Sequence, residues 1–236
     1  MQLFYAPDIV LPRYTLGRDE SRHAVKVLRL GVGDTLHITD GRGNMHCCRI
    51  EEASPDRCVV GVVSTEAEYG KLPYNLTLAV APTKNAERYE WFLEKATEIG
   101  VGHIVALECD RSERRTLKRD RGERIIASAI KQSLKAYCPQ FECTVPFGEF
   151  VARDFTGRRF IAHCAGPLGV KKYLASTLHA GEDAVVMIGP EGDFSPEEIR
   201  RAVECGFEEI TLGEQRLRTE TAAVVAATVA SVVNGL

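Results

Sequence analysis

The sequence predicts an α/β protein in which a small β-rich domain precedes a larger domain built on a parallel sheet. The last fifty residues predict a strand, a glycine-bearing loop and a helix, twice in succession. Residues 76–107 predict another strand–helix–strand unit, and residues 1–70 contain short strands separated by turns. Alternating strands and helices are typical of parallel sheets, and short strands with regular turns are typical of barrels. We therefore expect domains at 1–70 and 71–236.

The composition fits a folded protein of a reducing cellular compartment. The 236 residues carry a net charge of −3, so any surface for nucleic acid must be a local basic patch. Eight cysteines show no Cys-x-x-Cys pair and no zinc-like spacing, and we expect free thiols and no metal. The amino terminus lacks the pattern of a secretory signal, and no apolar run is long enough to span a membrane. A soluble cytoplasmic protein is expected.

The first domain is predicted from three short strands. Residues 35–39, 45–50 and 58–63 are strand-like, and Asp40–Asn44 provides a hairpin turn between the first two. This pattern suggests a small β-barrel.

A basic stretch between Leu16 and Leu30 predicts a helix. Arg18, Arg22, Lys26 and Arg29 have spacings that share one helical face. Spacing alone leaves two readings open, a solvated helix face and a face that contacts phosphates.

The second domain begins after a polar linker at residues 64–75. Residues 76–81 predict a strand, 86–99 an amphipathic helix that ends at Gly100, and 103–107 the next strand. Residues 125–136 predict a helix. Further strands and helices are predicted less clearly at 141–145, 147–153, 158–163 and 170–178.

A concentrated basic segment lies between Arg111 and Arg124. It holds seven basic and three acidic residues, an excess of four on a chain of net charge −3. A solvated loop with internal ion pairs is one reading, and a surface that neutralises RNA phosphates is the other and the favoured one.

The first carboxy-terminal unit begins with the apolar run Ala184–Ile188, which predicts a strand buried on both faces. The loop Gly189–Gly192 follows. Ser195 and Glu198 have the spacing of a capping box, and Pro196 occupies the permitted first helical position. The helix is expected to end at Cys205–Gly206.

The second unit predicts a strand near 209–212, a loop at 213–218, and a helix from Glu220 to about Val233 capped by Thr219. This helix is apolar nearly all round, which fits either a buried core helix or an oligomer interface. Glycines at strand exits allow a ligand to approach the main chain, and such a pocket suits a nucleoside. The sequence has neither Gly-x-Gly-x-x-Gly nor a phosphate loop.

Two separate motifs, in this order, carry a family resemblance. Residues 188–195, Ile-Gly-Pro-Glu-Gly-Asp-Phe-Ser, and residues 212–222, with Leu-Gly and Leu-Arg-Thr-Glu-Thr-Ala, resemble the bacterial 16S rRNA uridine-N3 methyltransferases of the SPOUT superfamily. The resemblance implies a SPOUT-type α/β domain with a trefoil knot, a PUA-like β-barrel domain before it, S-adenosylmethionine as cofactor, and a homodimer. It also implies 16S rRNA of the small ribosomal subunit as substrate.

The resemblance assigns roles to individual residues. It implies cofactor contacts through the main chain at Ile188, Gly189, Pro190, Gly192, Leu212, Gly213, Leu217 and Thr219. It implies RNA binding by Arg22, His23, Lys26, Arg29, Arg111, Arg114 and Arg115. Arg218 is the candidate for stabilising negative charge on the uracil carbonyls, because arginine stays protonated and cannot serve as the base. Glu220 and Glu191 are candidate proton acceptors, although glutamate in a first helical turn commonly serves the helix dipole.

Three positions depart from the family pattern, and at one of them Lys135 stands where arginine is expected. Asp193 replaces the glycine expected after Gly192, and aspartate tolerates a left-handed backbone better than most residues. His163 is followed by Cys164–Gly166 rather than by an acidic residue, which leaves little support for a role of His163. Two other functions stay open, a ribose 2′-O methyltransferase of the same superfamily and an RNA-binding assembly factor without catalysis.

Overall fold

The computed structural model describes residues 1–166 and 171–235. The chain divides into two compact units. The first combines Met1–Lys71 with Ala127–Cys138, and the second combines residues 72–126 with the chain from Pro139 onward. The segment Ala127–Cys138 thus belongs to the same unit as the amino-terminal residues, although more than fifty residues separate the two in the sequence. Each unit has its own buried core.

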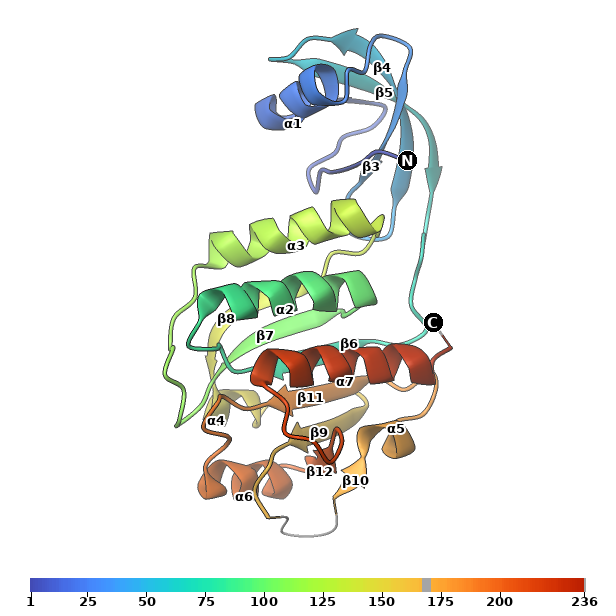
Figure 1. The fold of residues 1–236 in the computed structure, drawn as a ribbon. Helices are drawn as coiled ribbons and strands as arrows, with labels where there is room; N and C mark the ends of the chain where they lie inside the picture. Colours follow the sequence, from blue (N-terminus) through green and yellow to red (C-terminus); the bar gives the residue numbers. More distant parts are fainter. Residues whose placement is uncertain (167–170, 236) are drawn as a thin grey trace. The chain divides into compact units, whose positions relative to one another are not determined.

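The first unit is a five-stranded sheet in the order β1-β3-β4-β5-β2. Its strands are β1 (Leu3–Tyr5), β2 (Arg13–Thr15), β3 (Thr35–Thr39), β4 (Met45–Ala53) and β5 (Cys58–Glu66). The three predicted strands are confirmed, and β4 and β5 extend further than expected. The long strands bend, so that the sheet curls into a half-barrel (Figure 1). At the predicted turn, the Asp40 carboxylate accepts hydrogen bonds from the amides of Arg42 and Asn44.

The predicted basic helix of the first unit is shorter and less regular than its spacing suggests. Helix α1 (Arg18–Arg22) continues as a single π-helical segment, η1 (His23–Val27). Arg29 lies beyond the helix with a φ of 57°. The expectation of one helical face that includes Arg29 is therefore wrong. Buried Ala24 and half-buried Val25 pack on the sheet, and this packing fixes the segment through contacts that a helical repeat does not encode.

Helix α3 (Arg119–Ser133) begins earlier and ends earlier than predicted, and its second half belongs to the first unit. There the chain after the helix bonds to the β3–β4 turn. The Thr39 hydroxyl donates to the carbonyl of Ala136 at 3.1 Å, and the Cys138 amide donates to the carbonyl of Gly41 at 2.9 Å. Tertiary contacts thus place a segment that sequence distance would assign elsewhere.

The second unit is a seven-stranded sheet in the order β10-β12-β9-β11-β6-β7-β8, and every pairing in it is parallel. Its strands are β6 (Leu76–Val80), β7 (His103–Glu108), β8 (Gln140–Pro146), β9 (Arg158–Ala162), β10 (Lys172–Tyr173), β11 (Ala184–Ile188) and β12 (Glu208–Thr211). Of the predicted element at 170–178, Val170 lies outside the described residues, and β10 and helix α5 (Leu174–Thr177) account for most of the rest.

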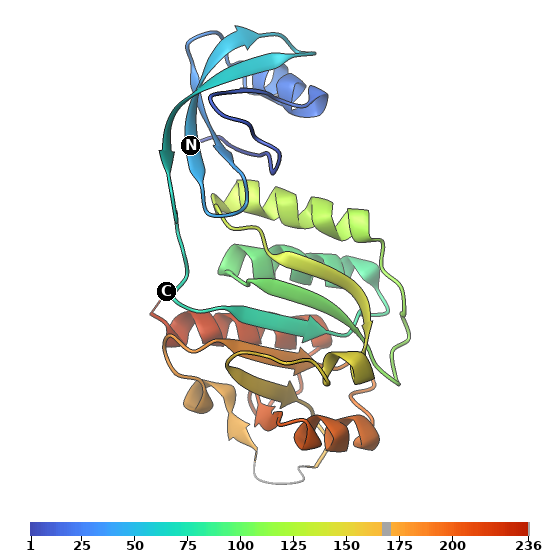
Figure 2. The same ribbon diagram turned by 180° about the vertical axis from the view of Figure 1, so that it is seen from behind.

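Helices cover both faces of this sheet (Figures 1 and 2). On one face lie α2 (Ala86–Ile99) and α7 (Thr219–Val233), which pack against each other. On the other lie α4 (Phe147–Phe150) and α6 (Pro196–Glu204), whose apolar side chains join the core formed by alternate residues of the strands. Parallel strands are buried on both faces in this way, which explains the continuous apolar runs in the sequence.

Two helices of the second unit follow their local signals closely. Asn85 caps α2, and Gly100 ends it with a φ of 120°. Ser195 and Glu198 form the predicted capping box of α6, Pro196 is its first residue, and Gly206 follows it with a φ of 84°. In the part of the chain that the structure describes, none of the helices has the length and apolarity needed to cross a membrane.

Candidate functional site

The principal cavity of the second unit lies at the carboxyl ends of β9, β11 and β12. Its volume is about 820 Å³, and the loops that follow these three strands and the first turn of α7 line it. All eight predicted cofactor residues line this cavity, together with Arg218. Parallel strands gather their carboxyl ends at one edge of the sheet, and ligands of such folds bind at that edge. Two motifs that are separate in sequence therefore share one cavity.

Thr219 connects the two motifs in a way that its expected capping role did not include. Arg218 is the N-cap residue of α7, and its side chain makes no cap hydrogen bond there. The buried Thr219 hydroxyl instead donates to the carbonyl of Gly189 at 3.0 Å. The prediction that Thr219 caps the helix is wrong, because a contact with a loop thirty residues earlier in the chain uses its hydroxyl.

The two glycines of the motifs are required for different reasons. A Cβ at Gly189 would lie 3.1 Å from the Phe194 ring, so the neighbouring core demands the small residue there. Gly213 has a φ of 148° and open space where a Cβ would be, so its backbone conformation demands glycine. A β-branched residue at Gly189 would disturb core packing as well as any ligand.

Groups that follow two other strands, the main-chain amide of Lys84 and the side chain of Arg111, fix the loop after β11. The Glu191 carboxylate accepts a hydrogen bond from the amide of Lys84 at 2.9 Å. The Arg111 guanidinium donates to the carbonyls of Gly192 at 2.8 Å and Phe194 at 3.3 Å. Charged hydrogen bonds of this kind are the stronger ones in proteins. The loop is therefore preformed by contacts that only the tertiary structure reveals.

The candidate catalytic residues occupy different environments. Arg218 is exposed and lines the cavity. Glu220 is 7 % exposed and its Oε1 lies 3.8 Å from Nε of Arg88, which itself lines the cavity. Within the described residues, Arg218 forms no ion pair with Glu214 or Glu220, so its guanidinium can serve a ligand. Arg88 was not predicted, because only the fold brings α2 beside α7.

His163 is a buried structural residue at the end of β9. Its Nε2 lies 3.0 Å from Oε1 of Glu209, and its side chain is fully buried. Burial, together with the Lys171 ammonium, lowers the pKa of His163, although Glu209 and Asp193 oppose this. Its Nε2 has a partner on the neighbouring strand, whereas its buried Nδ1 has no hydrogen-bond partner among the described residues.

The family model for the RNA methyltransferase domain matches residues 70–231, and the model for the RNA methyltransferase PUA domain matches residues 16–63. The first match covers more than half of the chain. This protein belongs to the RNA methyltransferase family.

Relatives of known name or structure resemble the methyltransferase along nearly its whole length. The ribosomal RNA small subunit methyltransferase E of Bacillus subtilis (strain 168) is 26 % identical, over 91 % of this chain and 88 % of the relative. A crystal structure of a probable rRNA-methyltransferase from Porphyromonas gingivalis is 43 % identical with a TM-score of 0.93, and covers 100 % of this chain and 99 % of that one.

A third relative carries a ligand. The ribosomal RNA small subunit methyltransferase E of Neisseria gonorrhoeae was crystallised bound to S-adenosyl methionine. It is 27 % identical to this methyltransferase with a TM-score of 0.84, and the match covers 97 % of this chain and 95 % of that one.

The predicted RNA-binding residues of the methyltransferase fall into two groups. Arg22, His23, Lys26 and Arg29 are exposed on the first unit. In the second unit, Arg111 holds the loop after β11, Arg114 donates to the carbonyl of Lys84 at 3.0 Å, and Arg115 pairs with Glu108 at 2.6 Å. These three arginines have internal partners, which the charge count could not reveal.

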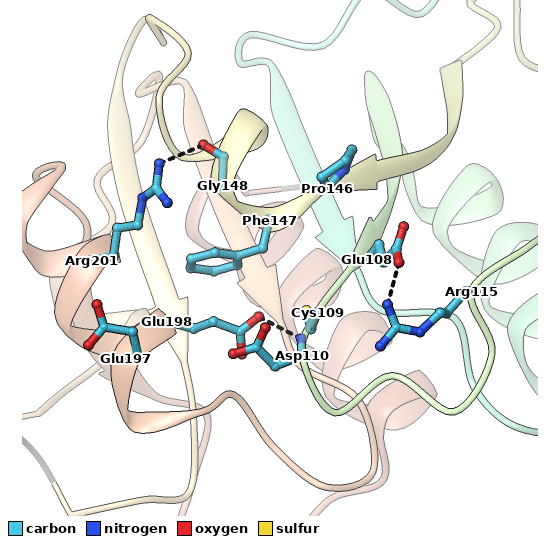
Figure 3. Close-up of a pocket in the computed structure, with 10 residues that line it drawn as sticks. All are labelled: Glu108, Cys109, Asp110, Arg115, Pro146, Phe147, Gly148, Glu197, Glu198 and Arg201. Carbon is cyan, nitrogen blue, oxygen red and sulfur yellow. Dashed lines mark hydrogen bonds and ion pairs between the residues drawn. The ribbon is translucent and has the colours of Figure 1, made fainter.

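A second hollow of the methyltransferase, about 370 Å³, lies between β7, α4 and α6 (Figure 3). The Glu198 carboxylate accepts the amide of Asp110 at 2.9 Å, and Arg115 pairs with Glu108. Arg201 donates to a main-chain carbonyl of α4 at 3.3 Å. Glu198 and Arg201 therefore tie α6 to the loop after β7 and to α4. The larger cavity, which both sequence motifs line, is the candidate site.

Proposed function

We propose that this methyltransferase transfers a methyl group from S-adenosylmethionine to N3 of a uridine in 16S rRNA of the small ribosomal subunit. The observation that carries the proposal is the single cavity formed by both sequence motifs, with Arg218 on its wall and no ion pair for that arginine among the described residues. The names of the relatives support the RNA substrate, and the ligand of the Neisseria gonorrhoeae protein supports the cofactor.

The residues of the cavity fit this cofactor. Its volume lies within the roughly 300–1,000 Å³ typical of small-molecule sites. Ile188, Leu212 and Leu217 supply apolar walls for a nucleoside, and the adjacent glycines expose main chain to its polar edges. Glu191 adds a carboxylate to the lining, which suits a cationic sulfonium. S-adenosylmethionine supplies an electrophilic methyl group when bound.

The residues of the chain contribute position and charge. Uridine N3 carries a proton that must leave before or during attack, and negative charge then develops on the two uracil carbonyls. The Arg218 guanidinium can donate a pair of hydrogen bonds to one of those oxygens while remaining charged, which leaves the N3 edge open to the methyl group. Glu220 pairs with Arg88. We propose that Glu220 either orients Arg88 at the cavity wall or accepts the proton from N3. Glu191 is held by the Lys84 amide, which favours a role in the loop.

The decisive test is nucleoside analysis of unmodified small subunits after incubation with the protein and S-adenosylmethionine. N3-methyluridine is the expected product. A 2′-O-methylated nucleoside would retain the superfamily and reject the N3 reaction. Binding of the subunit without any methylated product would favour an assembly factor that lacks catalysis.

We propose a division of labour between residues 1–70, a PUA-like RNA-binding domain, and residues 71–236, a SPOUT domain that ends in a trefoil knot. The segment Ala127–Cys138 of the second range belongs structurally to the first unit. The insertion of β12 between β9 and β10 and the return of α7 to β6 and β11 support the threading of the chain end. We expect activity in the cytoplasm.

A homodimer is the expected state. Val232 on α7 is 66 % exposed, and Val224, Val225 and Val229 are only half-buried, so the helix offers apolar surface for a second copy. Light scattering of the purified protein should give twice the mass of one chain, and a single-chain mass at micromolar concentration would reject the dimer.

Thr219→Val is expected to weaken S-adenosylmethionine binding about 10-fold, because it leaves the buried Gly189 carbonyl without its partner and frees the two loops from each other. Calorimetric titration measures this. Thr219→Ser keeps the hydroxyl and should bind nearly as the wild type does. Equal affinity in all three proteins would remove the bond from the account of the site.

Replacing Arg22 and Lys26 together by alanine should weaken binding to small-subunit RNA without affecting cofactor affinity. If each side chain contacts a phosphate, the slope of log K against log salt concentration falls by about 1 per residue. Arg57→Ala removes another exposed arginine of the first unit and serves as the control. An unchanged salt slope would show that the helix face is merely solvated.

A further inference from the structure

Asp193 stands in the loop after β11 at a position where the family motif predicts glycine. Its φ is 63°, and its amide donates to the carbonyl of Pro190 at 2.9 Å, which closes a turn. The prediction that aspartate tolerates a left-handed backbone here is confirmed. Glycine would adopt this conformation with less strain. The side chain must therefore contribute something that offsets the backbone preference.

The Asp193 carboxylate joins two strand exits. Its Oδ2 accepts hydrogen bonds from the amides of Cys164 at 2.8 Å and Ala165 at 3.1 Å, and its Oδ1 accepts one from the amide of Phe194 at 2.9 Å. Cys164 and Ala165 follow β9, whereas Asp193 and Phe194 follow β11. Asp193, Cys164 and Ala165 all line the principal cavity. One carboxylate thus fixes two loops of the same wall.

Lys171 binds the same turn through the main-chain carbonyls of the turn. Its ammonium donates to the carbonyls of His163 at 2.7 Å and Ala165 at 2.6 Å. An anion therefore binds the amides of the turn and a cation binds its carbonyls. Cys164 and Ala165 are exposed, so packing gives them little support and these charged hydrogen bonds provide most of their order.

We infer that Asp193 is a positioning residue for the cofactor site: its carboxylate, with Lys171 on the other side of the turn, fixes residues 163–165 as a wall of the cavity. The inference rests on the proposed function for the identity of the ligand. The ordering of the turn by Asp193 and Lys171 does not depend on which ligand binds.

The test is Asp193→Gly, which removes the carboxylate and keeps the left-handed backbone free of strain. Hydrogen exchange of the Cys164 and Ala165 amides, measured on the protein without ligand, should accelerate at least about 10-fold, because local opening no longer breaks a charged hydrogen bond. Calorimetric titration with S-adenosylmethionine should show affinity about 10-fold lower, with a smaller change in kcat at saturating cofactor than in KM for it.

Three further variants separate positioning from general stability. Asp40→Gly removes a carboxylate that also accepts two amides, in a turn of the first unit, and should leave cofactor affinity unchanged. Asp193→Asn retains an acceptor for the turn and should restore part of the affinity. As a single substitution, Lys171→Met should weaken S-adenosylmethionine binding. In the Asp193→Gly background the same substitution should have a smaller effect, since both residues order one turn.

The outcomes distinguish the inference from the proposed function. If the wild type binds S-adenosylmethionine and Asp193→Gly binds it equally, with both amides still protected, Asp193 has no positioning role. If the wild type does not bind S-adenosylmethionine, the proposed function fails, and the exchange rates still decide whether Asp193 orders the turn.

Discussion

Replacing Arg218 by alanine is expected to lower kcat for rRNA methylation about 100- to 1,000-fold, the loss typical of removing a donor that stabilises developing negative charge. Arg218 lines the cavity, is exposed, and has no ion pair among the described residues that would account for it structurally. The proposed reaction places its guanidinium against the uracil carbonyls, where negative charge would develop during methyl transfer. Single-turnover rates with saturating cofactor and subunit measure the chemical step directly.

Measurements of cofactor affinity and stability, and two further arginine variants, complete this test. Cofactor affinity and thermal stability should be close to those of the wild type in Arg218→Ala, because the side chain makes no cap hydrogen bond. Arg218→Lys keeps the charge but loses the paired donors, and only a small part of the rate should return. Arg200→Ala, on the outer surface of α6, is the matched control. A single-turnover rate within a few-fold of wild type in Arg218→Ala would remove this arginine from the mechanism.

Phe194→Ala is expected to lower the free energy of unfolding of the second unit by about 3–5 kcal/mol, the usual cost of truncating a buried phenylalanine. The residue is 1 % exposed and its ring centroid lies 5.8 Å from that of Phe147. The ring also lies directly against Gly189, so its loss leaves the loop after β11 without support. Denaturant unfolding measures the change in stability, and calorimetric titration measures the accompanying loss of cofactor affinity.

Phe155, a half-buried phenylalanine packed against the same core, separates stability from site geometry. Phe155 packs on Phe207 in the same core, with centroids 6.0 Å apart, and does not line the cavity. Phe155→Ala should destabilise the protein without a comparable loss of cofactor affinity. If both variants lose affinity equally, the effect of Phe194 on the site is only a consequence of reduced stability. A change in stability below 1 kcal/mol in Phe194→Ala would contradict the packing of its ring.

Features that depend on neighbouring residues were predictable from the sequence. The capping box of α6 needs only Ser195 and Glu198, and both of its hydrogen bonds are present. The buried strand β11 has the bounds that its apolar run predicts. Both motifs line one cavity because parallel strands end at the same edge, which follows from recognising the strands.

Features that depend on distant residues were not predictable. The Thr219 hydroxyl has a helix amide and the Gly189 carbonyl as possible partners, and only the folded chain decides between them. Arg111 belongs to a basic segment by charge, yet its guanidinium donates to carbonyls 81 and 83 residues later in the chain. In such cases the local sequence predicts which chemical group is available but not the distant residue with which that group pairs.

The position of β12 in the sheet has a consequence for biosynthesis. This strand pairs with β9 on one side and β10 on the other, and the loop after it supplies a wall of the cavity. A chain that the ribosome has synthesised only as far as Phe207 has β9 and β11 but lacks this wall. Contacts between distant segments also form slowly. The nascent chain therefore cannot assemble this site until β12 and the loop after it have been synthesised, so cofactor binding has to follow the synthesis of these segments.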